Sequence, residues 1–299
     1  MTLKHSIQTI AVALTLAALL PAHAAEKAPA PAKTVQKTYA APEEAARALA
    51  DAIRADDMKA LLAVVGPDAR GWLSSGDDVA DREGRKRFLV AYDRKHAISR
   101  VADDKVFLTI GEDDWPFPAP LLRQANGWVF DAQAGREEIV NRRIGRNELD
   151  TIQTLLAIVD AQREYASADP DRNGFHDYAR RFRSSPGKKD GLFWPVAAGE
   201  ANSPMGPLIA AAAREGYGKG KADSGKPAAY HGYRYRILTA LIGGFAVVAY
   251  PVQHDSSGVM TFIVNHDGVV YQKNLGPGTE AAASNMRSYD PDASWKAVQ

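Results

Sequence analysis

The feature that most constrains the fold of this chain is a helical period that continues from about Arg136 to Tyr165. Charged side chains are interspersed along its first half, and apolar side chains recur at three- and four-residue spacing: Ile139, Ile144, Leu149, Ile152, Leu155, Leu156, Val159 and Tyr165. Because helices of globular proteins usually span about 10–14 residues, this period predicts an unusually long helix. We expect it to leave one domain and enter the next.

Helical patterns also open the part of the chain that precedes the long helix. Pro42 is a favoured first helical residue, and the apolar residues after it have helical spacing as far as Ile53. Asp57 is a suitable N-cap for a second short helix. A third amphipathic segment runs from about Arg82 to His96.

The period then changes from helical to alternating. Val106, Leu108 and Ile110 alternate as one face of a strand does, and Asn126-Gly127 between apolar runs is a strong signal for a β-hairpin. Helices followed by a curved antiparallel sheet resemble the nuclear-transport-factor-2-like (NTF2-like) fold. That fold is used by both enzymes and binding modules, so the resemblance implies no particular function.

Three adjacent acids, Glu112, Asp113 and Asp114, precede Trp115 and Phe117 in this region. One interpretation is a pocket mouth in which a carboxyl group with a raised pKa acts as the acid or base of a hydrolase. The other is a proline-stiffened edge with solvated acids. We favour the second, because side chains alternate in direction along a strand and these acids need not converge.

The second half of the long helix, RNELDTIQTLLAIVDAQREYAS, resembles the helix of type IV pilins and pseudopilins. The matching residues are Asn147, Glu148, Leu155, Ile158, Ala161, Gln162 and Tyr165. Apolar runs separated by turn signals follow and predict an antiparallel sheet. The predicted fold is α+β, with an NTF2-like domain at 41–135 and the long helix plus a pilin-like sheet domain at 136–299.

Several longer segments resemble an exported bacterial family known as domain of unknown function 2950 (DUF2950). They are GREEIVNRRIGRNEL (135–149), AQREYA (161–166), GKKDGLFWP (187–195), SPMGPL (203–208) and the run from GFAVVAYP through GVMTFIVNHDGVVYQKNLG (244–276). The resemblance implies export. It supplies neither an activity nor catalytic residues.

The N-terminal segment predicts export. Lys4 is followed by an apolar run from about Ile7 to Leu20 and by Ala22-His23-Ala24, the pattern of a signal peptide that ends at residue 24. The apolar run is shorter than the roughly 20 residues that span a bilayer. Residues 25–40, rich in Ala, Pro and Lys, are expected to form a disordered linker. We therefore expect a bacterial protein of the periplasm or the extracellular space, with no integral membrane segment after cleavage.

Composition excludes several kinds of chemistry in an exported chain. With no cysteine, disulfides, thiolate metal sites and cysteine nucleophiles are unavailable. Loss of Lys4 brings the formal charge from +1 to zero, which argues against a nucleic-acid partner. The histidines have no zinc-site spacing, and the common serine-nucleophile motifs are missing.

We therefore expect a non-catalytic binding or structural module of the cell envelope, with an envelope protein or a small ligand as partner. The alternatives are a hydrolase that uses the acids around Asp113 and a pseudopilin-like assembly subunit. The pilin pattern lacks its apolar half-helix here, which counts against the assembly subunit.

One stretch, ADPDRNGFHDY, has the opening of a calcium-binding loop. Its loop positions one, three, five and nine are Asp169, Asp171, Asn173 and Asp177, and Gly174 lies at the sharp turn. Position twelve is Arg180, where a glutamate normally completes the shell. Calcium is the one cofactor that the sequence suggests, as a weak structural site. The alternative is that Asp171 or Asn173 caps a short helix and turns the chain, because Phe175, Tyr178, Ala179 and Phe182 recur at helical spacing.

The segment around Tyr217 has two readings as well. Gly216–Lys221 is glycine-rich but lacks the context of a phosphate loop, so we expect a flexible, solvated loop. Tyr217 and Tyr230, together with Phe193 and Trp194, are candidates to line a ligand pocket. Filling the core is the more frequent use of such aromatic residues.

Overall fold

The computed structural model describes residues 35–172, 174–218, 227–238 and 243–298. These residues belong to one compact unit, Thr34–Gln299. The signal peptide predicted at 1–24 and most of the linker predicted at 25–40 lie outside the described residues. Within the described ranges, no helix combines the length and the apolar character needed to cross a membrane.

The first four helices are α1 (Pro42–Arg54), α2 (Met58–Val65), the short α3 (Arg70–Leu73) and α4 (Asp78–Arg94), with a 3-10 turn at Pro67–Ala69 before α3. Three of them, α1, α2 and α4, correspond to predicted segments, although α4 begins at Asp78 rather than about Arg82; α3 was not predicted. Asp57 caps α2 by accepting a hydrogen bond from the Ala60 amide at 3.0 Å. Asp77 caps α4 in the same way, through the amides of Val79 and Ala80.

The first sheet is antiparallel with the strand order β1-β2-β4-β5, and β3 pairs with β2. Its strands are β1 (His96–Ala102), β2 (Lys105–Ile110), β3 (Trp115–Pro116), β4 (Leu121–Gln124) and β5 (Gly127–Phe130). Every second residue of β2 is buried, as the alternating pattern predicts. Helices α1 and α2 contact β5, while α4 contacts β1 and β2. The first core lies between these helices and the sheet.

The long helix α5 (Ala132–Ala168) begins after Asp131, whose carboxylate accepts hydrogen bonds from the amides of Gln133 and Ala134. It ends at Asp169, which has the left-handed φ of 42°. Near its start, Ile139 and Val140 pack against the first core. The pilin-like motif residues further along are buried in the second half of the protein, except for the partly buried Glu148, with Leu155 and Ile158 in the second core. A single helix thus contributes to both cores.

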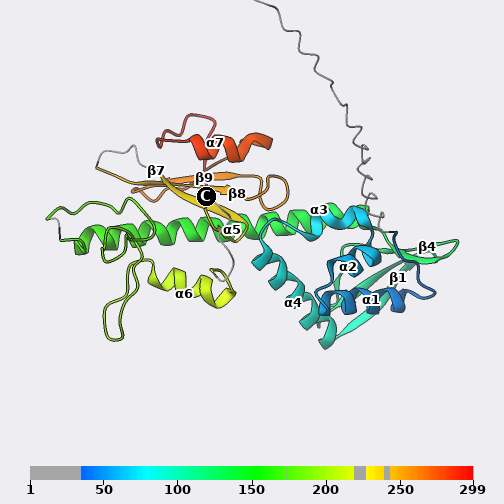
Figure 1. Ribbon diagram of the computed structural model, residues 1–299. Helices are drawn as coiled ribbons and strands as arrows, with labels where there is room; N and C mark the ends of the chain where they lie inside the picture. Colours follow the sequence, from blue (N-terminus) through cyan, green and yellow to red (C-terminus); the bar gives the residue numbers. More distant parts are fainter. Residues whose placement is uncertain (1–34, 173, 219–226, 239–242, 299) are drawn as a thin grey trace, which may run out of the picture. The chain divides into compact units, whose positions relative to one another are not determined.

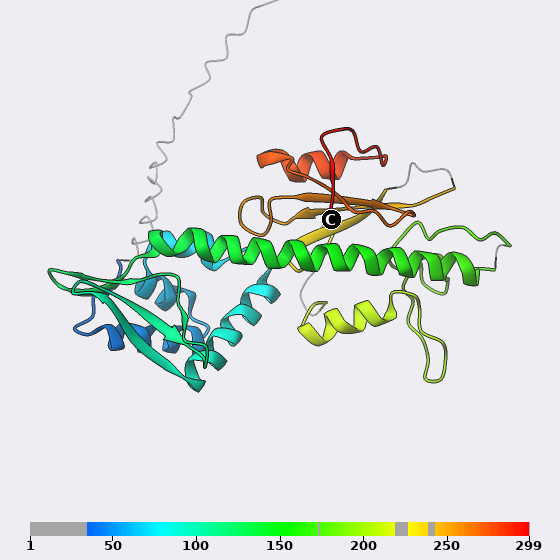
Figure 2. The ribbon, with the colours of Figure 1, turned by 180° about the vertical axis from the view of Figure 1, so that it is seen from behind.

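The second sheet is also antiparallel, with the order β11-β10-β9-β8-β7-β6. Its strands are β6 (Ala229–Tyr230), β7 (Tyr233–Leu238), β8 (Ala246–Pro251), β9 (Thr261–Asn265), β10 (Tyr271–Lys273) and β11 (Lys296–Ala297). Helix α5 lies on one face and α7 (Thr279–Asn285) on the other (Figures 1 and 2). Helix α6 (Gly206–Glu215) precedes the sheet in the chain.

The residues of β8 divide alternately between two cores. Val247 and Ala249 belong to the core on the α5 side, whereas Ala246, Val248 and Tyr250 belong to the core on the α7 side. This division follows from the two-residue period of a strand. It explains why AVVAYP reads as a continuous apolar run, because both faces of this strand are covered.

The α+β class is confirmed by these elements, whereas the short helix predicted after Gly174 is wrong. The described residues from Gly174 to Phe182 form no helix. Instead, Gln162 of α5 accepts from the Ala179 amide and donates to the Ala179 carbonyl, both at 2.8 Å. Phe182 accepts a backbone hydrogen bond from Phe193. These tertiary contacts outweigh the local helical spacing. The NTF2-like and pilin-like resemblances remain predictions.

Candidate functional site

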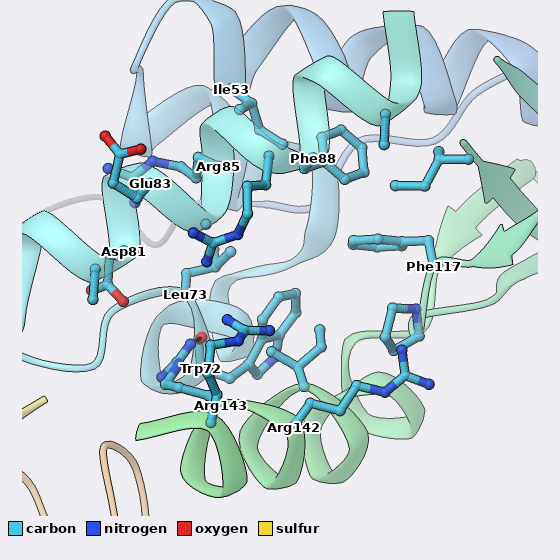
Figure 3. Close-up of a pocket in the computed structure, with 18 of the residues that line it drawn as sticks. Ile53, Trp72, Leu73, Asp81, Glu83, Arg85, Phe88, Phe117, Arg142 and Arg143 are labelled. Carbon is cyan, nitrogen blue, oxygen red and sulfur yellow. Dashed lines mark hydrogen bonds between the residues drawn. The ribbon is translucent and has the colours of Figure 1, made fainter. Parts of the chain in front are cut away.

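A pocket of about 620 Å³ lies beside α4 and α5. Side chains of the first core make its apolar wall, among them Ile53, Leu61, Trp72, Phe88, Phe117 and Ile139. The rings of Phe88 and Phe117 meet edge to face with their centroids 5.6 Å apart. Figure 3 shows Arg142 and Arg143 on α5 at one side of this space and Arg85 and Phe88 on α4 at the other.

Arginines form much of the polar lining. Arg85 and Arg87 come from α4, and Arg142, Arg143 and Arg146 come from α5. The α5 arginines share a side of the helix because residues three or four positions apart are neighbours on its surface. The same period that packs Ile139 against the core therefore brings these cations to the pocket.

Three of the arginines have partners. Arg85 pairs with Asp56 at 3.2 Å. Arg142 donates to Glu138 at 2.5 Å and lies over the Trp115 ring, 4.8 Å from its centroid. Arg143 donates to the Trp72 carbonyl, and burial lowers its pKa although the negative charge of Asp81 raises it. These contacts hold the walls of the pocket in place.

Asp77 joins α4 to the β6–β7 turn. Its carboxylate is buried, at 2% exposure, and one oxygen caps α4. The other oxygen accepts hydrogen bonds from the Tyr217 hydroxyl at 3.0 Å and the Gly232 amide at 2.7 Å. Burial and the charge of Asp77 raise the pKa of Tyr217, so this hydroxyl stays protonated and donates.

His231 bridges two carboxylates at the pocket wall. Its Nδ1 lies 3.4 Å from Asp150 of α5, and its Nε2 lies 3.2 Å from Glu215 at the end of α6. The backbone of His231 has a φ of 51°, a conformation uncommon outside glycine. Since both ring nitrogens face carboxylates, the imidazole ties α5 to α6 and has no nitrogen directed at a substrate.

The three acids of the hydrolase hypothesis do not converge. Glu112, Asp113 and Asp114 are all exposed, and of these only Asp113 lines the pocket. Asp114 pairs instead with Lys95 at 2.7 Å. The aromatic residues of the same hypothesis, Trp115 and Phe117, do line the pocket.

The aromatic candidates separate into two sites. Phe193 and Trp194 pack with the second core. Tyr217 lines the pocket, and the Tyr230 ring packs edge to face against it at 4.9 Å. The loop predicted at Gly216–Lys221 is described only as far as Gly218, where Tyr217 is fixed by Asp77 rather than solvated.

The acids of the predicted calcium loop follow α5. Asp169 accepts a hydrogen bond from the Gly174 amide at 3.2 Å. The pKa of Tyr165 is raised by burial and then by the charges of Asp171 and Asp177, which places both acids near its hydroxyl. Asn173 lies outside the described residues. Among the residues that are described, no three His, Cys, Asp or Glu side chains form a group suited to a metal. Calcium binding stays a prediction.

Sequence reasoning missed the residues that connect distant segments. Asp77 was unremarkable as one acid among many, and His231 belongs to no motif. The arginines of α5 were visible as charges on the first half of a long helix. Their spacing was the available signal that several of them share one side.

The fold and the site define an α+β protein with an apolar pocket lined in part by arginines. The sequence pattern of the family described as "Protein of unknown function (DUF2950)" matches residues 36–298, and the chain belongs to this family, as its motifs predicted. Comparison with curated proteins and with solved structures gave no match.

Proposed function

We propose that this protein is an exported, non-catalytic binding module of the bacterial cell envelope, and that it binds a small ligand with an apolar body in the pocket beside α4 and α5. The observation that carries the proposal is the pocket's apolar wall, built from the first core. Its volume of about 620 Å³ is within the roughly 300–1,000 Å³ of small-molecule sites.

The arrangement of ionisable groups favours binding over catalysis. An enzyme needs two or more such groups directed at one reacting atom. Here Asp150 and Glu215 are engaged with His231, and Asp81 accepts a hydrogen bond from the Ser75 amide. The pilin-like residues of α5 are engaged in packing within the protein, which argues against an assembly surface made from them.

Ligand binding is tested on the protein beginning at Ala25, through the intrinsic fluorescence of Trp72 and Trp115 in the pocket wall. Decanol is the first probe, because it has an apolar chain and no charge. We expect a saturable change in emission. Ala91→Phe, which fills part of the pocket, should weaken binding at least tenfold. Val90→Phe is the matched control, because Val90 is 61% exposed on the same helix. A flat titration of the unaltered protein, with decanol and also with charged amphiphiles of the same chain length, would refute the proposal.

Export is tested by cell fractionation with N-terminal sequencing of the recovered protein. We expect a periplasmic or extracellular form whose first residue is Ala25, as the pattern before it implies. Recovery from the cytoplasm with the first 24 residues intact would overturn this part of the proposal.

A further inference from the structure

Two of the five arginines that line the pocket have no counterion. Arg87 of α4 and Arg146 of α5 form neither a hydrogen bond nor an ion pair with any residue that the structure describes. Arg85, Arg142 and Arg143 on the same two helices all have partners. Arg87 and Arg146 are therefore available to a bound molecule.

These two arginines face the same space. An atom added as Cβ on Gly84 would lie 3.8 Å from Nη2 of Arg87, and Gly84 itself lines the pocket. The surrounding protein desolvates Arg146, although its side chain reaches the surface, and this lowers its pKa. The positive charge of Arg87 lowers that pKa further, whereas the negative charge of Asp150 raises it. A bound anion would offset the repulsion between two cations that line the same pocket.

The acids of the pocket form no ion pair with either arginine among the described residues, although the negative charge of Asp150 acts on Arg146. Glu83 is paired with Lys86 at 2.5 Å, and Asp150 and Glu215 flank His231. Asp81 accepts from the Ser75 amide and lies near Arg143. Asp113 is the remaining acid, and it is exposed after β2. The unpaired positive charge thus lies between α4 and α5.

We propose that Arg87 and Arg146 form an anion subsite that binds the carboxylate or phosphate head group of an amphipathic ligand, whose chain lies along the apolar wall. The planar guanidinium groups suit the oxygens of either head group, because each can donate two parallel hydrogen bonds. This inference rests on the proposed function and adds to it the chemistry of the ligand.

The test compares decanol, decanoate and decyl phosphate, which share a chain and differ in the head group, together with inorganic phosphate alone. The unaltered protein should bind at least one of the charged amphiphiles ten or more times more tightly than decanol. The double variant Arg87→Gln/Arg146→Gln should lose that preference and still bind decanol.

The matched control is Arg94→Gln/Arg136→Gln, which removes the same charge from exposed positions of α4 and α5 outside the pocket. It should keep the preference. Circular dichroism of all variants checks that they fold. If the unaltered protein binds decanol, decanoate and decyl phosphate equally, or if the double variant keeps the preference, the subsite is overturned and the proposed function still stands.

If none of the three decyl compounds binds, the proposed function is refuted, and the subsite with it. Inorganic phosphate that binds as tightly as decyl phosphate would support the arginine pair and overturn the amphipathic ligand.

Discussion

The two sheets of this protein differ in how many of their faces are covered. In the first sheet β2 buries every second residue, and β1 exposes all of its residues except the half-buried Ile98. In the second sheet every residue of β8 and β9 is buried. The second sheet therefore uses both faces for packing, between α5 and α7.

Because of this difference, stability and ligand binding depend on different regions of the chain. A strand buried on both faces has no side chain left for a ligand. The helices over the first sheet contact it on one side and leave the pocket between α4 and α5. We infer that the second region mainly stabilises the protein, whereas the first region carries the site.

The largest expected effect comes from truncating a side chain of the second sheet. Phe262 is fully buried in β9, so Phe262→Ala should lower the free energy of unfolding by about 3–5 kcal/mol. Phe88→Ala at the pocket should lower it by only roughly 1–2 kcal/mol, because Phe88 is partly buried. Urea denaturation measures both. Equal losses would contradict the division between the two regions.

The next effect concerns Asp77, which connects the regions. Asp77→Ala removes the cap of α4 and leaves the Tyr217 hydroxyl and the Gly232 amide without their acceptor. We expect a loss of roughly 2–4 kcal/mol in thermal or urea unfolding. Asp78→Ala is the control, because Asp78 is exposed next to it. If both variants lose the same free energy of unfolding, the hydrogen bonds of Asp77 to Tyr217 and Gly232 do not contribute the expected stability.

Two glycines of α5 should respond to alanine with opposite signs. A Cβ on Gly135 would lie 2.7 Å from backbone atoms of Ala119, so Gly135→Ala should cost about 1–3 kcal/mol. A Cβ on Gly145 meets no described atom within 4 Å, and Gly145→Ala should stabilise by about 0.5–1 kcal/mol. Differential scanning calorimetry would detect the opposite shifts. A gain at Gly135 would mean that α5 is not held closely against the first region.

The smallest expected effect is that of calcium on the loop after α5. A site with a dissociation constant near 1 mM would raise the free energy of unfolding by about 1.4 kcal/mol at 10 mM calcium. Asp171→Asn should abolish this gain. Thermal unfolding with magnesium as the control measures it. No change with calcium would decide for the alternative that Asp169 and its neighbours only turn the chain.

Much of the fold was predictable because it depends on local periodicity. The alternation of Val106, Leu108 and Ile110 placed β2, and Asn126-Gly127 placed the β4–β5 hairpin. The long period predicted α5. These patterns report which side of an element faces a core, and that is settled within a few neighbouring residues.

The site was less predictable because its contacts join distant residues. Tyr217 contacts Asp77, and His231 contacts Asp150, across segments that lie far apart in the sequence. No periodicity encodes such a pairing. The wrong helix after Gly174 has the same cause, since a hydrogen bond from Gln162 fixes Ala179 in a non-helical backbone.

The placement of α5 also has a consequence for folding. Ile139 packs in the first core and Leu155 in the second, along one uninterrupted helix. Melting either core would free part of that helix and remove support from the other. The whole unit should therefore unfold in a single calorimetric transition. A fragment that ends at residue 135 would lack Ile139 and Val140, so its exposed core should make it prone to aggregate.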